Sequence, residues 1–190
     1  MKLMDKSKFD LMQMPFIREE LQIVKMITHN NIVEMKEIFE SQDEIRIVME
    51  QVNEGELFEH INTYEMEEKE VALIMYQLID VIYYLQCSGI VHRDLKTENI
   101  LIKKDTKDEI NQIKVTDFGL SKIIGPNAQI DKREFCGTPA YVSPELCSRK
   151  NYGKEVDMWS AGVIFYILIC RSLPFHGFDR KSTLKMIMEK

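Results

Sequence analysis

The stretch IVHRDLKTENILI, residues 90–102, holds a run of polar groups between two apolar ends. A carboxylate such as that of Asp94 can orient a hydroxyl group and accept its proton. The ammonium group of Lys96 can bind an anion, and the amide oxygen of Asn99 suits a hard cation such as Mg²⁺. Taken alone, the stretch is equally well explained as a polar loop between a helix and a strand.

A second motif favours the chemical interpretation. The stretch has the form H-R-D-L-x-x-x-N, and DFG follows at residues 117–119. This pair resembles the signature of protein kinases, which transfer a phosphoryl group from ATP to a hydroxyl group. The resemblance implies that Asp94 accepts the proton and that Asn99 and Asp117 bind Mg²⁺. It also implies that Lys96 contacts the transferred phosphoryl oxygens.

Further matches extend the resemblance over nearly the whole chain and narrow it to eukaryotic-type serine/threonine kinases. CGTPAYVSPE, residues 136–145, resembles the substrate-docking loop of that family. The resemblance implies that Thr138, with Lys96, selects serine or threonine over tyrosine as acceptor. DMWSAGVIFYIL, residues 157–168, resembles the family's central helix, whose leading acid, Asp157, binds the H-R-D backbone. An acid that simply caps its own helix is the alternative.

The N-terminal part resembles the nucleotide-binding half of a kinase. Met1-Lys2 is similar to the end of the V-A-I-K motif, and Glu20, placed before the HNNIV histidine, is similar to its glutamate partner. The alternative for Lys2 is an ordinary surface lysine. VMEQVNEGELF resembles the hinge that binds adenine. The implied contacts are Met49 beside the adenine, Glu50 and Val52 through backbone hydrogen bonds, Leu101 below the ring, and Glu56 and Glu98 toward ribose and substrate arginines.

Two parts of the family pattern are not found in the sequence. No G-x-G-x-x-G loop precedes Lys2, and the chain stops before the arginine that pairs with Glu145 in the family. We therefore expect a kinase fragment, truncated at both ends. A non-catalytic, kinase-like binding or scaffold module is the alternative function.

One acidic residue suggests how the docking loop is ordered. Related kinases often carry a phosphorylated threonine two residues before the cysteine of this loop, and that phosphate pairs with the H-R-D arginine. Glu134 occupies this position. We hypothesise that Glu134 pairs with Arg93 as a permanent, weaker substitute for the phosphate. A solvated glutamate is the alternative, because exposed pairs contribute little.

Apolar spacing predicts the elements that position these groups. We expect a helix at 15–27, a hairpin of strands at 32–41 and 44–51, a long helix at 67–89, a second hairpin of 100–102 with 113–115, a buried helix at 161–170 and a helix near the C-terminal end. Between the second pair of strands, Asp105 and Asp108 lack the pattern of a calcium-binding EF-hand loop, so we expect a solvated turn.

These elements and the resemblance predict an α+β fold of the bilobal kinase type. Residues 1–52 would form a truncated, β-rich small lobe that ends at the hinge. Residues 53–190 would form a mostly helical large lobe that lacks its last helices. ATP and Mg²⁺ are the implied cofactors, and the implied partners are proteins with a serine or threonine preceded by basic residues.

Composition limits the other partners. With 31 acidic and 25 basic side chains, the net charge of −6 argues against nucleic acid and anionic membranes. The apolar run at 161–170 is too short to span a bilayer. Four scattered cysteines without zinc-site spacing favour a reduced, cytoplasmic location.

The C-terminal part resembles calcium/calmodulin-dependent and calcium-dependent kinases. Because the sequence contains neither an EF-hand nor a calmodulin-binding helix, calcium or calmodulin control would require regions outside this chain.

Overall fold

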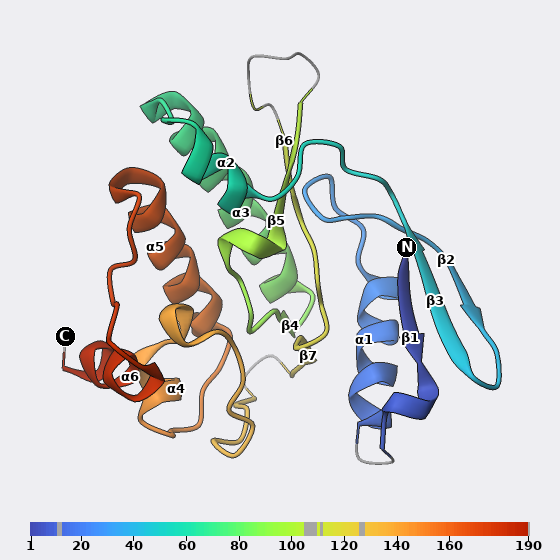
Figure 1. Ribbon diagram of the computed structural model, residues 1–190. Helices are drawn as coiled ribbons and strands as arrows, with labels where there is room; N and C mark the ends of the chain where they lie inside the picture. The colour runs from blue at the N-terminus through green and yellow to red at the C-terminus, as the bar shows by residue number, and fades with distance from the viewer. Residues whose placement is uncertain (11–12, 105–109, 111, 126–127, 190) are drawn as a thin grey trace.

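The computed structural model of the protein describes residues 1–10, 13–104, 110, 112–125 and 128–189. The chain forms a small part made of a sheet and one helix, and a larger, mostly helical part (Figure 1). This arrangement confirms the expected α+β class. The turn that holds Asp105 and Asp108 lies outside the described residues. The lobe boundary after residue 52 stays a prediction.

The small part is an antiparallel sheet packed against helix α1 (Met14–Met26). Its strands are β1 (Lys2–Asp5), β2 (Met35–Glu40) and β3 (Glu44–Met49), in the order β1-β3-β2. Alternate residues of a strand face opposite sides. Ile45 and Ile47 of β3 are therefore both buried, and they form a core with Ile17 and Leu21 of α1. The first strand starts at Lys2 and extends past the lysine motif.

The larger part contains five helices among the described residues, together with two short strand pairs. The helices are α2 (Leu57–Thr63), α3 (Glu68–Cys87), α4 (Pro144–Cys147), α5 (Glu155–Cys170) and α6 (Arg180–Met188). The strand pairs are β5 (Ile100–Lys103) with β6 (Gln112–Val115), and β4 (Ile90–Val91) with β7 (Lys122–Ile123). The long helix and the second hairpin agree with the expectation. The pair β4–β7 was not expected, because strands of two residues are too short to show periodicity.

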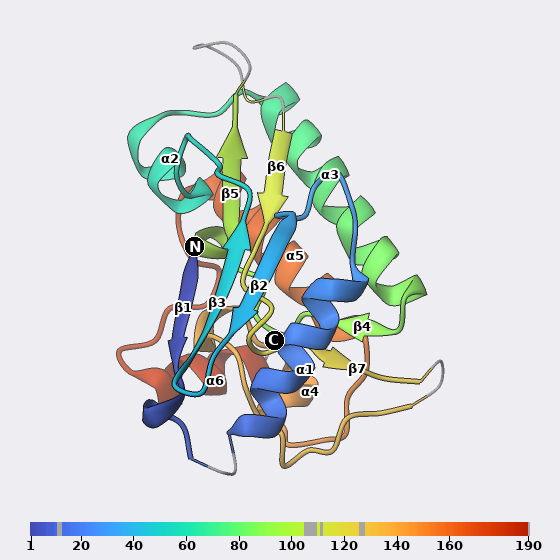
Figure 2. The same ribbon diagram turned by 90° about the vertical axis from the view of Figure 1, so that its right-hand side faces the viewer.

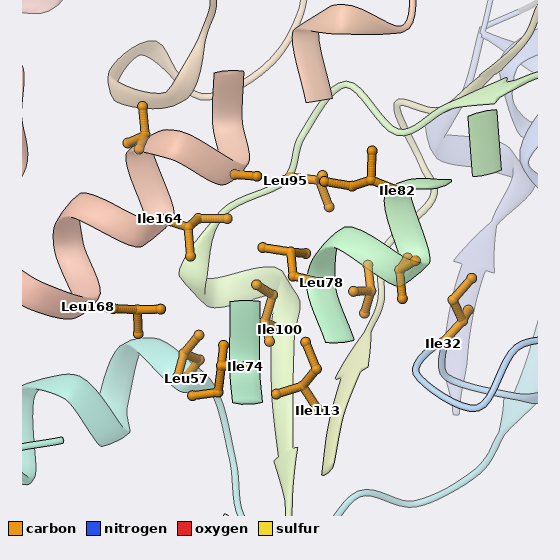
Figure 3. Close-up of a cluster of buried hydrophobic side chains, with 14 of the residues drawn as sticks. Ile32, Leu57, Ile74, Leu78, Ile82, Leu95, Ile100, Ile113, Ile164 and Leu168 are labelled. Carbon is orange, nitrogen blue, oxygen red and sulfur yellow. The ribbon is translucent and has the colours of Figure 1, made fainter. Parts of the chain in front are cut away.

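Helices α3 and α5 enclose the main core (Figure 3). Leu78 of α3 and Ile164 of α5 are fully buried, as are Ile100 of β5 and Ile113 of β6. By length and composition alone, α3 could also cross a membrane. Its buried residues instead pack in the protein interior, which is the arrangement of a core helix.

The apolar helix α5 is only partly buried. Ile164 and Leu168 lie in the core, whereas Phe165 and Ile169 are 46% and 60% exposed. The expectation of a buried helix at 161–170 is therefore wrong for one of its faces. A sequence that is apolar on every side cannot show which side meets the core.

One junction between the two parts lies at strand β6. Val115 of β6 donates its N–H to Asn31 O at 2.8 Å and accepts from Val33 N at 2.9 Å. The side chain of Asn31 also donates to Ile113 O at 3.0 Å and to the side chain of Gln77 on α3. Figure 2 shows the upper end of β2 beside β6. Backbone and side-chain hydrogen bonds therefore attach the small part to the strand that leads to DFG.

We predict that Leu78→Ala will lower the free energy of unfolding by about 2–5 kcal/mol, because it opens a cavity in a closed core. The matched control is Leu73→Ala on the same helix, where the side chain is 36% exposed and the loss should be clearly smaller. Denaturant unfolding of both variants measures the difference. Equal losses would contradict the proposed core.

Candidate active site

The loop between β4 and β5 is fixed by a buried carboxylate on α5. Asp157 accepts hydrogen bonds from His92 N at 2.8 Å and from Arg93 N at 2.9 Å. Arg93 has a φ of 68°, a left-handed conformation that costs a non-glycine residue free energy. The N-cap of α5 is Lys154, so Asp157 holds this loop and does not cap its own helix.

Asp94 lies in this loop with its carboxylate almost fully buried. Its Oδ1 accepts from the backbone N of Thr138 at 3.0 Å and from the Thr138 hydroxyl at 2.8 Å. Its Oδ2 lies 3.0 Å from Lys96 Nζ and 3.2 Å from Asn99 Nδ2. Lys96 also donates to the Thr138 hydroxyl at 3.1 Å. The site thus holds a hydroxyl group between a carboxylate and an ammonium group.

A second charged group forms where the small part faces DFG. Lys2 Nζ lies 2.6 Å from Glu20 Oε1 on α1 and 3.2 Å from Asp117 Oδ1. Burial alone would lower the pKa of Lys2, but the two carboxylates outweigh it and raise that pKa. Burial would likewise raise the pKa of Asp117, but Lys2 and the N–H of Gly119 lower it. Both groups are therefore charged at neutral pH.

Two oxygen donors near this group could ligate Mg²⁺. Asn99 uses its Nδ2 to reach Asp94, so its Oδ1 is the atom suited to a cation. Asn99 O accepts from Thr116 N at 3.0 Å, which brings the residue next to Asp117, whose side chain is 49% exposed. Within the described part of the chain, no three or more His, Cys, Asp or Glu side chains form a ready-made metal site. The pair nevertheless fits Mg²⁺, which typically uses few protein ligands and completes its shell with phosphate and water.

A cavity of about 340 Å³ adjoins these charges. Lys2, Glu20 and Asp117 line one side, and Met49 lines it together with apolar side chains such as Ile47. The lining brings the expected phosphate-side residues and Met49 into one space. Among the described residues, the other predicted hinge and ribose positions do not line this cavity; these are Glu50, Val52, Glu56, Glu98 and Leu101.

Comparison with known proteins agrees with this geometry. The model of the family described as "Protein kinase domain" matches residues 1–190. The chain belongs to this family. Similar proteins include myosin light chain kinase A of Dictyostelium discoideum, 40% identical over 189 residues, which cover 99% of this chain and 63% of that protein. Human calcium/calmodulin-dependent protein kinase type IV is 43% identical over 161 residues, which cover 84% of this chain and 33% of that protein.

Human NUAK family SNF1-like kinase 1 is also similar, at 40% identity over 187 residues, which cover 96% of this chain and 27% of that protein. The kinase chain therefore spans between about a quarter and two thirds of the length of these relatives.

The predicted hinge of the kinase is anchored by a contact that the sequence did not reveal. Glu50 donates its backbone N–H to Glu34 O at 2.9 Å, so this N–H is engaged within the small part. Its side chain lies 2.6 Å from Lys114 Nζ of β6, in a largely buried pair. Burial would raise the pKa of Glu50, but Lys114 and the N–H of Glu34 lower it. Residues 64 positions apart meet here, and apolar periodicity carries no information about such a pair.

The remaining predicted residues lie outside the groups of charges described above. Glu56 precedes α2, and its backbone pairs with Leu101 of β5. Glu98 accepts from the Thr97 hydroxyl at 3.0 Å and from the Tyr141 hydroxyl at 3.4 Å. Val52 lies in the segment that joins β3 to α2 and is partly buried. Their expected contacts with nucleotide and substrate stay predictions.

Glu134 pairs with two cations. One of them, Arg93, is the partner hypothesised from the sequence. Its Oε2 lies 3.3 Å from Arg93 Nη1, and its Oε1 pairs with Lys122 of β7. Arg93 also donates to the Tyr152 hydroxyl at 3.1 Å, and that hydroxyl donates to Glu134 O at 2.8 Å. The sequence predicted the partner Arg93 but missed Lys122 and Tyr152, because the pairing of β7 with β4 brings Lys122 beside Arg93.

We predict that Glu134→Gln will lower the stability of the kinase at pH 7 but not at acidic pH. Burial would raise the pKa of Glu134, but Lys122 and Arg93 outweigh it and lower that pKa below its ordinary value of 4.5. A carboxyl group with a lowered pKa contributes stability above its unfolded-state pKa and loses it as pH falls through the folded-state pKa. Denaturant midpoints measured from pH 7 to well below the ordinary pKa of 4.5 would show the two proteins converging only below that value. A constant difference would mean that Glu134 acts through packing.

Proposed function

We propose that this chain is the ATP- and Mg²⁺-dependent catalytic core of a protein serine/threonine kinase. The observation that carries the proposal is the Thr138 hydroxyl, held 2.8 Å from Asp94 and 3.1 Å from Lys96. A substrate hydroxyl needs the same two neighbours, one to take its proton and one to neutralise phosphoryl charge. The names of the relatives, which describe them as kinases, support the transfer of a phosphoryl group.

The side chains have separate roles in this proposal. Asp94 orients the substrate hydroxyl and accepts its proton as the hydroxyl oxygen bonds to the γ-phosphorus of ATP and the bond from that phosphorus to the departing ADP breaks. Lys96 neutralises charge on the transferred group, and Lys2, aligned by Glu20, holds the phosphates. Asn99 and Asp117 would hold Mg²⁺, which would neutralise phosphate charge when bound.

The protein substrate is proposed to carry basic residues before its acceptor. Glu98 lies in the segment between β4 and β5 that also carries Asp94, the backbone of Glu56 pairs with Leu101 of β5, and the chain as a whole has a net charge of −6. We further propose a cytoplasmic location. Calcium or calmodulin control, suggested by the name of one relative, would act through residues outside this chain.

We predict that Asp94→Asn will reduce phosphoryl transfer by about 10²–10⁴-fold, because the amide cannot accept the proton. The assay is Mg-ATP-dependent phosphorylation of an arginine-containing serine peptide by the 190-residue chain. A folded chain without turnover would favour the alternative, a non-catalytic binding module. Turnover that survives in the variant would exclude Asp94 as the base.

We also predict that Glu134→Ala will lower turnover, because it removes the ion pairs with Arg93 and Lys122 that hold the segment leading into the docking loop. The matched control is Asp131→Ala in the same segment, whose carboxylate pairs with the exposed Arg133. The control should keep near-normal activity in the same peptide assay. Equal activity of wild type and Glu134→Ala would remove the idea that this carboxylate orders the loop.

A further inference from the structure

Helix α1 makes a contact with β7 that the proposed mechanism does not use. Glu19 Oε1 accepts a hydrogen bond from the backbone N of Ile123 at 3.0 Å. The next residue, Glu20, pairs with Lys2 at 2.6 Å. Consecutive residues of a helix project about 100° apart. Two adjacent carboxylates therefore attach α1 to two different elements, β1 on one side and β7 on the other.

The N–H of Ile123 lies on the outer edge of its strand pair. Strand β7 pairs with β4, and Ile124 N donates toward β4, to Gly89 O at 2.7 Å. Adjacent residues of a strand direct their backbone groups to opposite sides, so the N–H of Ile123 points away from β4. The carboxylate of Glu19 satisfies this donor in a charge-assisted hydrogen bond, which is stronger than a neutral one.

The same short strand carries the cation that holds Glu134. Lys122 precedes Ile123 and pairs with Glu134, which also contacts Arg93. Strand β7 thus joins the segment that leads into the docking loop, through Glu134, to helix α1, through Glu19. Lys2 is 36% exposed in its pair with Glu20, and partly exposed ion pairs contribute little by themselves. The pair therefore depends on the position of the helix that carries Glu20.

We propose that Glu19 is a positioning residue that seats helix α1 on strand β7 and thereby keeps Glu20 against Lys2. Its effect on catalysis rests on the proposed kinase function, whereas its effect on the Lys2–Glu20 pair does not. Loss of Glu19 leaves Ile123 N without its acceptor and lets α1 move away from β7. Lys2 then loses a well-placed partner.

The first test measures the contact and the ion pair without any assay of activity. In Glu19→Ala, hydrogen exchange at the Ile123 amide should accelerate, and chemical acetylation of Lys2, followed by peptide mass spectrometry, should become severalfold faster. Glu19→Gln keeps an acceptor oxygen and should restore both rates toward wild type. Glu20→Gln is the positive control for Lys2, and Gln22→Ala, an exposed change whose amide contacts Met26 within α1, is the negative control.

The two readouts separate the possible outcomes. Faster exchange at Ile123 with unchanged labelling of Lys2 would overturn the proposal, since Glu19 would then only satisfy a strand edge. Unchanged exchange at Ile123 would overturn the contact itself. Faster exchange and faster labelling together would support the proposal.

The second test asks whether Glu19 and Glu134 act through the same strand. Glu19→Ala should lower kcat/KM for the serine peptide by roughly tenfold, the size expected for one hydrogen bond to a charged group. In the double variant with Glu134→Ala, the combined loss should be smaller than the product of the single losses. Independent, multiplicative losses would overturn this link. Absence of turnover in the wild type would count against the proposed function alone, because the labelling test is unaffected.

Discussion

The candidate active site depends on how one buried carboxylate holds the backbone around it. Asp157 accepts two backbone hydrogen bonds from residues 92 and 93 and attaches the loop that carries Asp94 to the helix at the centre of the core. The left-handed conformation of Arg93 is stable only because its surroundings enforce it. That conformation directs the Arg93 side chain toward Glu134, while Asp94 meets Thr138. A packed interior thus sets the geometry of charged groups near the surface.

The charged side chains of the site form two groups, in each of which one residue pairs with two residues of opposite charge. Lys2 is shared by Glu20 and Asp117, and Glu134 is shared by Arg93 and Lys122. Around Lys2, Asp117 and Glu134, the neighbouring opposite charges outweigh the effect of partial burial on the pKa, so these three groups stay charged at neutral pH. The consequence is a site whose geometry is held before any ligand arrives, which lowers the cost of reorganisation during reaction.

The sequence predicted most of the features that lie within one stretch of the chain and few of the contacts between residues that are far apart in the sequence. Residues 90–102 carry their loop, their flanking strands and their chemistry within one stretch, and the Lys2–Glu20 pair followed from a familiar spacing. The Glu50–Lys114 pair could not be predicted, because it depends on how the hinge lies against β6. The pair β4–β7 has two residues per strand, too few for a periodic signal, so the contacts of Lys122 and Ile123 were missed with it. The exposed face of α5 was missed for the opposite reason, since its apolar residues surround the whole helix.

The carboxylate at position 134 also differs from a phosphate group in how long its charge persists. A phosphate at such a position is added by one enzyme and removed by another, so the loop can record whether a signal has arrived. A glutamate is present from synthesis until the protein is degraded, and no phosphatase can remove it. Position 134 therefore stores no information about the history of the molecule. Any control of this loop has to act on the residues that surround the charge, because the charge itself is encoded in the sequence.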